Sequence, residues 1–523
     1  MARKTLAFLI STLFVSSMLF ATGPPPAQAC GSQNWYLPEG YTGGNFDTYV
    51  LIQNPNDSSA EATVRFLTDN QITDPLVIDI APNSRYTVKV DDRPGLSSAN
   101  VSTMVEATHG VVVERAMYFN YPGGKAGGSN SIGARQTSRT WYLAEGYTGG
   151  DFDTYILVMN PNQVGVHIRV KFITPKDAGG RGANATEPQT DFITKEYDVS
   201  PMRRFTIHAD EVPGLENTEV SAIVESVSKT GGSRGGKGSE EVPGIIAERA
   251  MYFSYMGING GHCSIGAPSA SNTWYLPEGR TAGEYDTYVM VMNPNSTSTK
   301  VKTTFMVPAA GSGGGRSVNP YNPQPQPAPE PDETITKEYT LEPYERHTIA
   351  VDKIEGLEAT DIATMVQSWS AGEGSGSGSS CNPVVVERSM YFSRGNNGDG
   401  HNTIGATGKY EYWFMAEGYT AGGFDTWILV QNPNAREVEV RATFMKPEGE
   451  PIIKEYTVKQ ASRLTILVDE IPGLESTEVS TKLQVLNPDE YSTACEYGII
   501  AERAMYFEYN GFVGGHCSLG VGE

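Results

Sequence analysis

The sequence lacks the features that mark several common classes of protein. Its five cysteines form no Cys-x-x-Cys spacing, which argues against a structural zinc site or a dithiol redox motif. Only 39 residues are Lys or Arg, against 61 Asp or Glu, and the net charge of -22 argues against nucleic acid or an anionic membrane surface as a partner. After residue 21, no apolar run approaches the roughly 18 residues that would span a bilayer, so we expect no transmembrane segment in the mature chain.

Helical periodicity is also missing, whereas turn-forming residues are plentiful. No stretch with helical spacing reaches about 12 residues. The 57 glycines and 32 prolines favour many turns and short strands. Hydrophobic residues make up 39% of the chain and aromatic residues 10%, which is enough for packed cores. The length corresponds to roughly three to five domains.

The first 29 residues have the pattern of an export signal. Arg3 and Lys4 form a basic start, residues 5–21 are apolar, and Ala27-Gln28-Ala29 is the small-x-small pattern that signal peptidase cleaves. The alternative is a retained membrane anchor. Cleavage after Ala29 would make Cys30 the first mature residue, where a lipid could be attached. The large aliphatic residue usual before a lipidated cysteine is missing, so an ordinary N-terminus that begins with Cys is the favoured interpretation. We expect a secreted or surface-bound protein.

Export favours disulfides, although their connectivity cannot be deduced from sequence. The remaining cysteines are Cys263, Cys381, Cys495 and Cys517. Cys495 and Cys517 lie in one sequence module, so we predict that they form a pair.

Four copies of one sequence module fill the rest of the chain. Each opens with Trp-(Tyr/Phe)-(Leu/Met)-(Pro/Ala)-Glu-Gly and closes with Glu-Arg-(Ala/Ser)-Met-Tyr-Phe. The opening tryptophans are Trp35, Trp141, Trp274 and Trp413, and the closing glutamates are Glu114, Glu248, Glu387 and Glu502. Such a pattern, repeated four times, indicates tandem duplication. We therefore divide the chain into repeat 1 (34–134), repeat 2 (140–267), repeat 3 (273–406) and repeat 4 (412–521).

Insertions account for the differences in length between the repeats. Residues 309–332 of repeat 3 are rich in Pro and Gly, and repeats 2 and 3 carry Gly/Ser-rich insertions at 229–241 and 371–382. This composition predicts flexible loops on the surface of a fixed scaffold.

Alternating hydrophobicity predicts an all-β fold. In repeat 4, Val438, Val440 and Phe444 alternate with polar residues, which is the pattern of a half-buried strand. Seven or eight such strands in about 110 residues are typical of an antiparallel β-sandwich of immunoglobulin or fibronectin type. We predict four tandem sandwiches in an elongated string. The alternative is a β-propeller in which each repeat supplies two blades.

The opening and closing motifs resemble tandem modules of secreted bacterial proteins, most of them without an assigned function. The resemblance covers residues 34–521. It implies an exported, β-rich repeat protein and brings no catalytic residue with it.

The closing strand places a Glu-Arg pair among apolar residues. Such charges must be partnered, because an unpaired buried charge costs several kcal/mol. We predict a structural ion-pair network that joins each closing strand to the opening segment of its own repeat. The candidates are Glu39, Asp47, Glu114, Arg115, Glu145, Asp153, Asp210, Glu248, Arg249, Glu278, Asp286, Glu387, Arg388, Glu417, Asp425, Glu502 and Arg503.

The same acidic residues leave two other interpretations open. Calcium binding would use their oxygen atoms, although no Asp-x-Asp-x-Asp-Gly loop occurs. A glycosidase would need two carboxylates at one site, yet four similar modules show no special carboxylate, and the motifs of common hydrolases and nucleotide-binding enzymes are missing. We therefore expect no catalytic residue, no metal site and no cofactor.

The aromatic residues near each opening motif offer a possible ligand surface. Tyr41, Tyr147 and Tyr419 occupy one position that Arg280 fills in repeat 3, which suggests exposure. The alternative is that these rings belong to the core.

Together, these features predict an exported, non-enzymatic scaffold that binds a protein or glycan at the cell surface. The alternatives are a carbohydrate-binding adhesin and a carbohydrate-active enzyme.

Overall fold

The computed structural model describes residues 31–523, apart from 122–123, 176–191, 229–241, 308–333, 372–381, 395–396, 487–496 and 510. The export signal, Cys30, Cys381, Cys495 and almost all of the inserted loops lie outside the described residues.

Each repeat supplies seven or more β-strands. Repeat 1 contains β1 (Ser32–Leu37), β2 (Phe46–Asn54), β3 (Ala60–Thr68), β4 (Leu76–Ile80), β5 (Ser84–Lys89), β6 (Val101–Tyr121) and β7 (Lys125–Ile132). Repeat 2 contains β8 (Thr140–Leu143), β9 (Asp151–Asn160), β10 (Val166–Ile173), β11 (Phe192–Val199), β12 (Arg203–His208), β13 (Ser221–Val227), β14 (Ile246–Tyr255) and β15 (Ile258–Ile265).

The second half of the chain repeats this order. Repeat 3 contains β16 (Thr273–Leu276), β17 (Tyr285–Met292), β18 (Thr299–Met306), β19 (Thr334–Leu341), β20 (Arg346–Ala350), β21 (Ala363–Ser370), β22 (Val385–Arg394) and β23 (Asn397–Ile404). Repeat 4 contains β24 (Tyr412–Met415), β25 (Phe424–Asn432), β26 (Val438–Met445), β27 (Ile452–Val458), β28 (Ser462–Leu467), β29 (Ser480–Leu486), β30 (Ile500–Tyr509), β31 (Phe512–Leu519) and β32 (Val521–Gly522). Short 3-10 turns occur at η1 (Ala209–Glu211), η2 (Val351–Lys353) and η3 (Val468–Glu470).

The strands form because their side chains alternate between core and solvent. In β10, Ile168 and Val170 are buried, whereas the intervening Arg169 and Lys171 are half-buried. The strand pairs antiparallel with β11 on one side and β13 on the other. This period of two is the pattern that the sequence showed for repeat 4.

The prediction of four antiparallel β-sandwiches is confirmed. In repeat 2, one sheet has the order β11-β10-β13-β8 and the other has the order β12-β9-β14-β15. In repeat 1 the single long strand β6 takes part in both sheets. The opening tryptophan is buried in the core between the sheets. The Trp141 indole N–H donates to the carbonyl of Ile245, just before β14, and so links the opening strand to the closing one.

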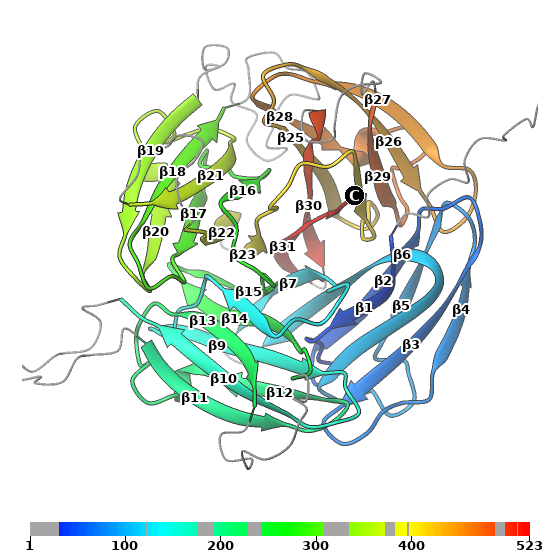
Figure 1. Ribbon diagram of the computed structural model, residues 1–523. Helices are drawn as coiled ribbons and strands as arrows, with labels where there is room; N and C mark the ends of the chain where they lie inside the picture. The colour runs from blue at the N-terminus through cyan, green and yellow to red at the C-terminus, as the bar shows by residue number, and fades with distance from the viewer. Residues whose placement is uncertain are drawn as a thin grey trace, which may run out of the picture.

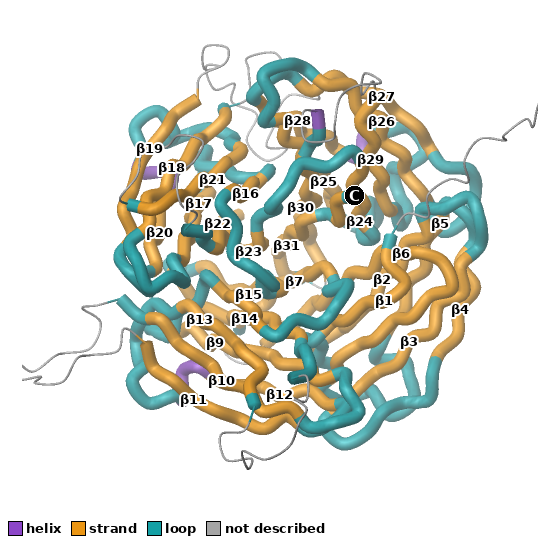
Figure 2. The backbone as a smooth tube through the Cα atoms, in the orientation of Figure 1, coloured by secondary structure: helices purple, strands orange, loops and turns teal. Residues whose placement is uncertain are grey.

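The sandwiches are not strung out as an elongated chain, as the sequence had suggested; they close into a ring (Figure 1). The hairpin strands β7, β15, β23 and β31 meet at the centre of the ring, and β4, β11, β19 and β27 lie on its outside (Figure 1). Figure 2 shows that strands make up most of every repeat. Radial closure is a feature of the propeller alternative that the structure shares. Alternation within a strand says nothing about this higher-order arrangement.

Repeat 4 meets repeat 1 directly. The Gln53 amide donates to the carbonyl of Thr481 across 3.2 Å, and the Gly31 N–H donates to the Glu523 carboxylate across 3.1 Å. The first and last repeats are therefore neighbours in space (Figure 1).

Candidate functional site

The Glu-Arg pairs of the closing strands lie at the junctions between repeats. Successive side chains of a strand point to opposite sides, so Glu248 and Arg249 of β14 face different neighbours. Glu248 turns toward repeat 1, and Arg249 turns toward repeat 3. The same arrangement recurs in β6, β22 and β30.

Four ion pairs follow from this arrangement and form a closed cycle. They join Arg115 to Glu248 (3.0 Å), Arg249 to Glu387 (2.6 Å), Arg388 to Glu502 (2.5 Å) and Arg503 to Glu114 (2.9 Å). Every pair connects one repeat to the next, and the last returns to the first. Partners within a single repeat were expected from the sequence, because a strand pattern cannot distinguish a partner in the same repeat from one in the next.

The closing glutamates also accept backbone hydrogen bonds from the preceding repeat. The Ala144 N–H donates to Glu387 across 2.6 Å, and the Ala416 N–H donates to Glu114 across 2.6 Å. The N–H groups of Glu39 and Glu278 do the same for Glu248 and Glu502. Each junction therefore combines a charged pair with a main-chain contact, as a buried charge requires.

The opening-motif glutamates complete the network. Arg249 lies 2.8 Å from Glu145, Arg388 lies 2.7 Å from Glu278, and Arg503 lies 2.8 Å from Glu417. These contacts join closing strand and opening segment within one repeat. In repeat 1, Glu39 instead lies 3.5 Å from Arg204 of repeat 2.

The aspartate candidates lie elsewhere. Asp153 pairs with Lys125 of repeat 1, and Asp47 pairs with Lys89. The carboxylate of Asp210 accepts the Thr154 N–H rather than binding Arg249. Burial raises the pKa of Asp286, and the charge of Asp352 adds to this rise. Burial also raises the pKa of Asp469 to about 7, and the charge of the nearby Asp425 contributes.

A second set of arginines at the junctions escaped the sequence analysis. Arg204 donates to the carbonyl of Gly40 (2.8 Å), Arg346 to that of Gly146 (2.7 Å), Arg463 to that of Gly279 (2.8 Å) and Arg85 to that of Gly418 (2.9 Å). Each of these arginines reaches the preceding repeat, whereas the closing arginines reach the following one. Its recurrence at one position in all four repeats is the signal that could have identified it.

Aromatic rings follow the same cycle. The Tyr and Phe of each closing motif pack edge to face with rings of the neighbouring repeats, with centroids 5.1–5.2 Å apart. The pairs are Phe119–Tyr252, Phe253–Tyr391, Phe392–Tyr506 and Phe507–Tyr118. Such contacts contribute about 0.5–1.5 kcal/mol each beyond the area that they bury.

The tyrosines considered as ligand-facing are half-buried. Tyr41, Tyr147 and Tyr419 each pack edge to face on the phenylalanine that follows in their own repeat. In repeat 3, Arg280 lies over the ring of Tyr285 and pairs with Asp361 at 2.7 Å. The side chain at this position therefore packs against an aromatic ring of its own repeat, next to the opening motif.

Burial governs the electrostatics of the junctions. It raises the pKa of Glu114 and Glu387 against the opposing effect of their arginine partners, and it raises the pKa of Glu502 to about 7. Burial also lowers the pKa of His401 to about 3. Burial thus favours the neutral form of the histidines and of the carboxyl groups, and the arginine partners oppose this effect at the carboxyl groups.

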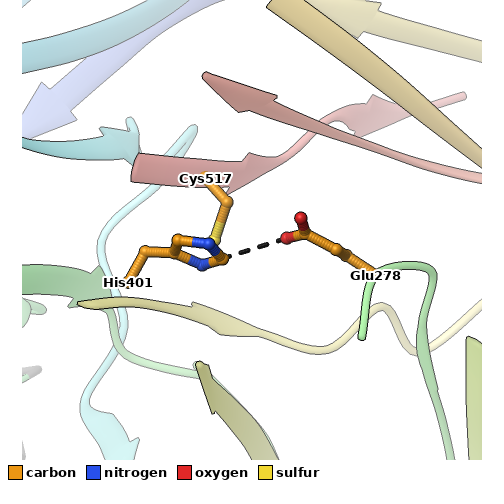
Figure 3. A group of neighbouring side chains, drawn as sticks. All are labelled: Glu278, His401 and Cys517. Atoms are coloured by element: carbon orange, nitrogen blue, oxygen red, sulfur yellow. Dashed lines mark ion pairs between the residues drawn. The ribbon is translucent and has the colours of Figure 1, made fainter. Parts of the chain in front are cut away.

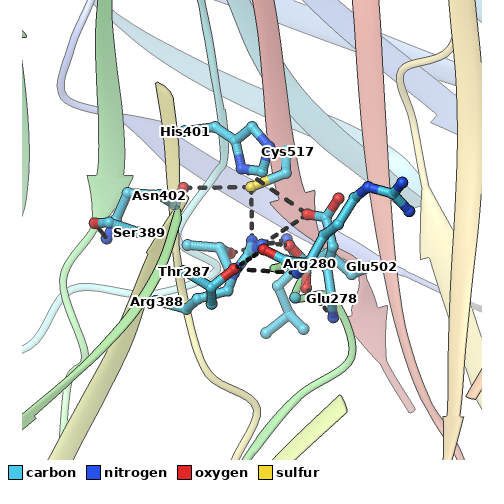
Figure 4. A network of polar contacts seen from close by, with 12 residues as sticks. Glu278, Arg280, Thr287, Arg388, Ser389, His401, Asn402, Glu502 and Cys517 are labelled. Atoms are coloured by element: carbon cyan, nitrogen blue, oxygen red, sulfur yellow. Dashed lines mark hydrogen bonds and ion pairs between the residues drawn. The ribbon is translucent and has the colours of Figure 1, made fainter. Parts of the chain in front are cut away.

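One junction gathers residues of the kinds that bind metals. Ligand atoms of Glu278, His401 and Cys517 all lie within 4.8 Å of one another (Figure 3). However, Arg388 lies among them: it pairs with Glu278 and donates to the Cys517 sulfur across 3.0 Å (Figure 4). A guanidinium group already supplies the positive charge there, so this set does not fit a metal ion.

The predicted disulfide between Cys495 and Cys517 stays a prediction, because only one of the two cysteines lies in the described residues. Cys517 is a free, buried thiol, as is Cys263, whose sulfur accepts a hydrogen bond from Arg115. Cys495, the predicted partner of Cys517, lies outside the described residues. Both described thiols serve as acceptors at a junction between repeats.

In the described part of the chain, no helix has the length and apolar composition needed to span a bilayer. The cavity beside Glu145 and Arg249 has room for about one water molecule.

No protein-family model and no curated protein matches this sequence. Among solved structures, the crystal structure of Thermotoga maritima 1070 is 20% identical over 20% of this chain and 96% of that chain, with a TM-score of 0.19. The Anabaena sensory rhodopsin transducer is 17% identical over 17% of this chain and 97% of that chain, with a TM-score of 0.15. A tetra-tandem repeat in the extending region of a large adhesion protein is 9% identical, covers 90% of this chain and 92% of that chain, and has a TM-score of 0.09. These scores are too low to support an inference.

Proposed function

We propose that the protein is an exported, non-enzymatic scaffold that acts at the cell surface or outside the cell. The observation that carries this proposal is the location of the recurring polar residues. The closing arginines and glutamates are buried at the junctions and bound to one another, as in the pair of Arg503 and Glu114. They hold four repeats in a ring and are shielded from solvent.

The outside of the ring is the part suited to a partner. The strands β11, β19 and β27 lie on the outer side (Figure 1), and each carries a Lys-Glu-Tyr sequence with an exposed or half-buried pattern. Similar surfaces repeated around a rigid ring allow several weak contacts with one partner, which raises overall affinity. A protein or a glycan with repeated features is the class of partner that fits.

The same geometry weighs against the enzyme alternative. A glycosidase needs two carboxylates that reach one sugar, whereas Glu145 and Glu387 both bind Arg249 inside the protein. The half-buried Tyr41, Tyr147 and Tyr419 likewise give little support to an adhesin whose sugar contacts are these rings.

Two measurements test the proposal. Cells that naturally produce the protein are fractionated and the N-terminus of the recovered chain is determined by mass spectrometry; we expect a chain that starts near Cys30, outside the cytoplasm. A chain in the cytoplasm that retains residues 1–29 would contradict export. The purified chain is also applied to a glycan array, with a hydrolysis assay on the same glycans. Turnover would contradict the scaffold, and binding without turnover would identify a glycan as its partner.

A further inference from the structure

The centre of the ring contains one residue that breaks its fourfold repetition. The strands β7, β15 and β31 carry a Gly-Gly pair where they meet at the centre, and β23 carries Asp399-Gly400. The glycines that correspond to Asp399 are Gly127, Gly260 and Gly514. Asp399 is fully buried.

The Asp399 carboxylate receives one hydrogen bond from every repeat. The N–H groups of Gly261 and Gly400 donate to Oδ1 across 3.1 and 2.8 Å. Those of Gly128 and Gly515 donate to Oδ2 across 3.1 and 3.2 Å. Each oxygen thus accepts two N–H groups, and four backbone dipoles from four repeats converge on one carboxyl group. Burial raises the pKa of this carboxyl group, and the four N–H groups act against that rise.

The cradle is built by the fold rather than by Asp399. The second glycine of each pair packs against a phenylalanine of the preceding repeat: a Cβ on Gly261 would lie 3.0 Å from Phe119, and one on Gly515 would lie 2.9 Å from Phe392. This packing sets the N–H groups around the centre. In the described part of the chain, no ion pair to Asp399 accompanies these four bonds. Converging N–H groups form an anion-binding concavity without any cationic side chain.

The centre has room for one side chain. A Cβ on Gly127 would meet only the Asp399 carboxylate among its nearest neighbours, and a Cβ on Gly514 would also meet the Phe507 ring at 2.7 Å. Four identical repeats with aspartate at this position would bring four carboxylates together. Because the four repeats belong to one chain, one of them can carry aspartate at this position while the other three keep glycine.

We propose that the centre of the ring is a binding site for one small carboxylate anion, and that Asp399 is its built-in occupant. The four N–H groups are complementary to two carboxylate oxygens, and the Asp399 side chain is a tethered counterpart of acetate. Without that side chain, the site would take acetate from solution. The tether makes the occupant permanent, because a covalently attached group does not lose the entropy of a free ligand on binding.

The first test uses the full mature chain with Asp399→Gly. We expect the melting temperature to fall by about 5 °C or more because four buried N–H groups lose their acceptor. Acetate should restore part of this loss in proportion to the logarithm of its concentration. Formate should restore less because it leaves a gap, and propionate should restore less because it exceeds the space. The wild-type chain in the same salts, and both chains in sodium chloride of equal ionic strength, control for general salt effects.

The second test moves the carboxylate to another repeat. Gly127→Asp alone should destabilise the ring strongly because it adds a second carboxylate at the centre. In the double variant Gly127→Asp/Asp399→Gly, the same change should raise the melting temperature above that of Asp399→Gly. Gly127→Asp should therefore destabilise the chain that contains Asp399 and stabilise the chain that lacks it. A local packing role of Asp399 does not explain this reversal.

Several results would overturn the proposal. These are an Asp399→Gly chain as stable as the wild type, an acetate response equal in the two chains, and a double variant no more stable than Asp399→Gly. If Asp399→Gly does not fold in chloride, its refolding yield in acetate is measured; a yield no higher in acetate than in chloride would count equally against the site.

Discussion

Arg503 in the last repeat lies 2.9 Å from Glu114 in the first, although 389 residues separate them in the sequence. Both side chains are 0% exposed. The same pair joins each of the other repeats to its successor, so this contact closes the cycle. The ring therefore depends on a bond that no single repeat can form alone.

Replacing Arg503 with Met should destabilise the protein by about 3–5 kcal/mol, because Glu114 and Glu417 would remain buried without their partner. Urea unfolding of the purified chain measures this change. The double variant Arg503→Met/Glu114→Gln should recover part of the loss. Arg65→Met is the matched control: Arg65 pairs with Glu106 at the surface, where the side chains are 33% and 50% exposed, and its loss should cost about 1 kcal/mol or less. Equal effects at the two sites would contradict the buried cycle.

Adding a methyl group to Gly261 should disturb the centre of the ring. Its Cβ would lie 2.7 Å from the Tyr252 ring and 3.0 Å from Phe119 of the preceding repeat. Gly261→Ala should therefore cost about 1–3 kcal/mol, as overpacking does. Gly165→Ala, whose Cβ would find its nearest neighbour at 3.7 Å, should change stability by no more than about 0.5 kcal/mol. Thermal unfolding of both variants checks the difference, and a tolerated alanine at 261 would show that the centre is loosely packed.

The buried His262 should make the stability of the ring depend on pH. Burial, aided by the charge of Arg249, lowers the pKa of His262 well below its ordinary value of 6.5. Below a pH of about 6.5, His262 binds a proton in the unfolded chain but not in the folded chain, so the contribution of His262 to stability falls with the pH. The raised pKa of Glu502 acts in the opposite direction over the same range. His262→Ser, which copies Ser129 of repeat 1, should lower the slope of stability against pH by up to about 1.4 kcal/mol per pH unit.

Urea unfolding at several pH values between 7 and 4 gives this slope. His109→Ser is the control for the substitution itself, because His109 is exposed. An unchanged slope for His262→Ser would show that His262 is charged in the folded chain.

Cys263 and Cys517 should resist alkylation while the ring is intact. Burial raises the pKa of Cys263 to about 12 and raises that of Cys517 still more clearly, and the thiolate is the reactive form. Iodoacetamide should modify both in urea without any reductant, which peptide mass spectrometry detects. If Cys517 reacts only after reduction, it forms a disulfide, which would contradict a free thiol at this position.

Much of the fold could be predicted from the sequence because strand alternation and repetition are local signals. Val438, Val440 and Phe444 show a half-buried strand by their spacing alone, and the recurring Trp413 motif shows where each repeat begins. The ring could not be predicted in this way. The pattern around Glu248 and Arg249 shows that both need partners, but the identity of the partners depends on how whole repeats meet.

The centre of the ring shows the same limit. Asp399 differs from the glycines at the same position of the other three repeats, and this departure was visible in the sequence. The role of Asp399 could be inferred only from the four N–H groups that donate to it, because the sequence does not show where backbone donors lie. The arginines typified by Arg204 were visible as a recurrence, but their acceptors are likewise main-chain carbonyls.

Small-angle X-ray scattering of the mature chain tests ring closure most directly. A compact chain of this length should have a radius of gyration of about 23 Å, whereas four domains in a straight line should give about 40 Å by the same scaling. We predict a radius of gyration of about 23 Å for the wild-type chain. Arg503→Met removes the ion pair with Glu114 that joins repeats 4 and 1, so this variant should have a larger radius of gyration. A value near the upper figure for the wild-type chain would contradict the ring.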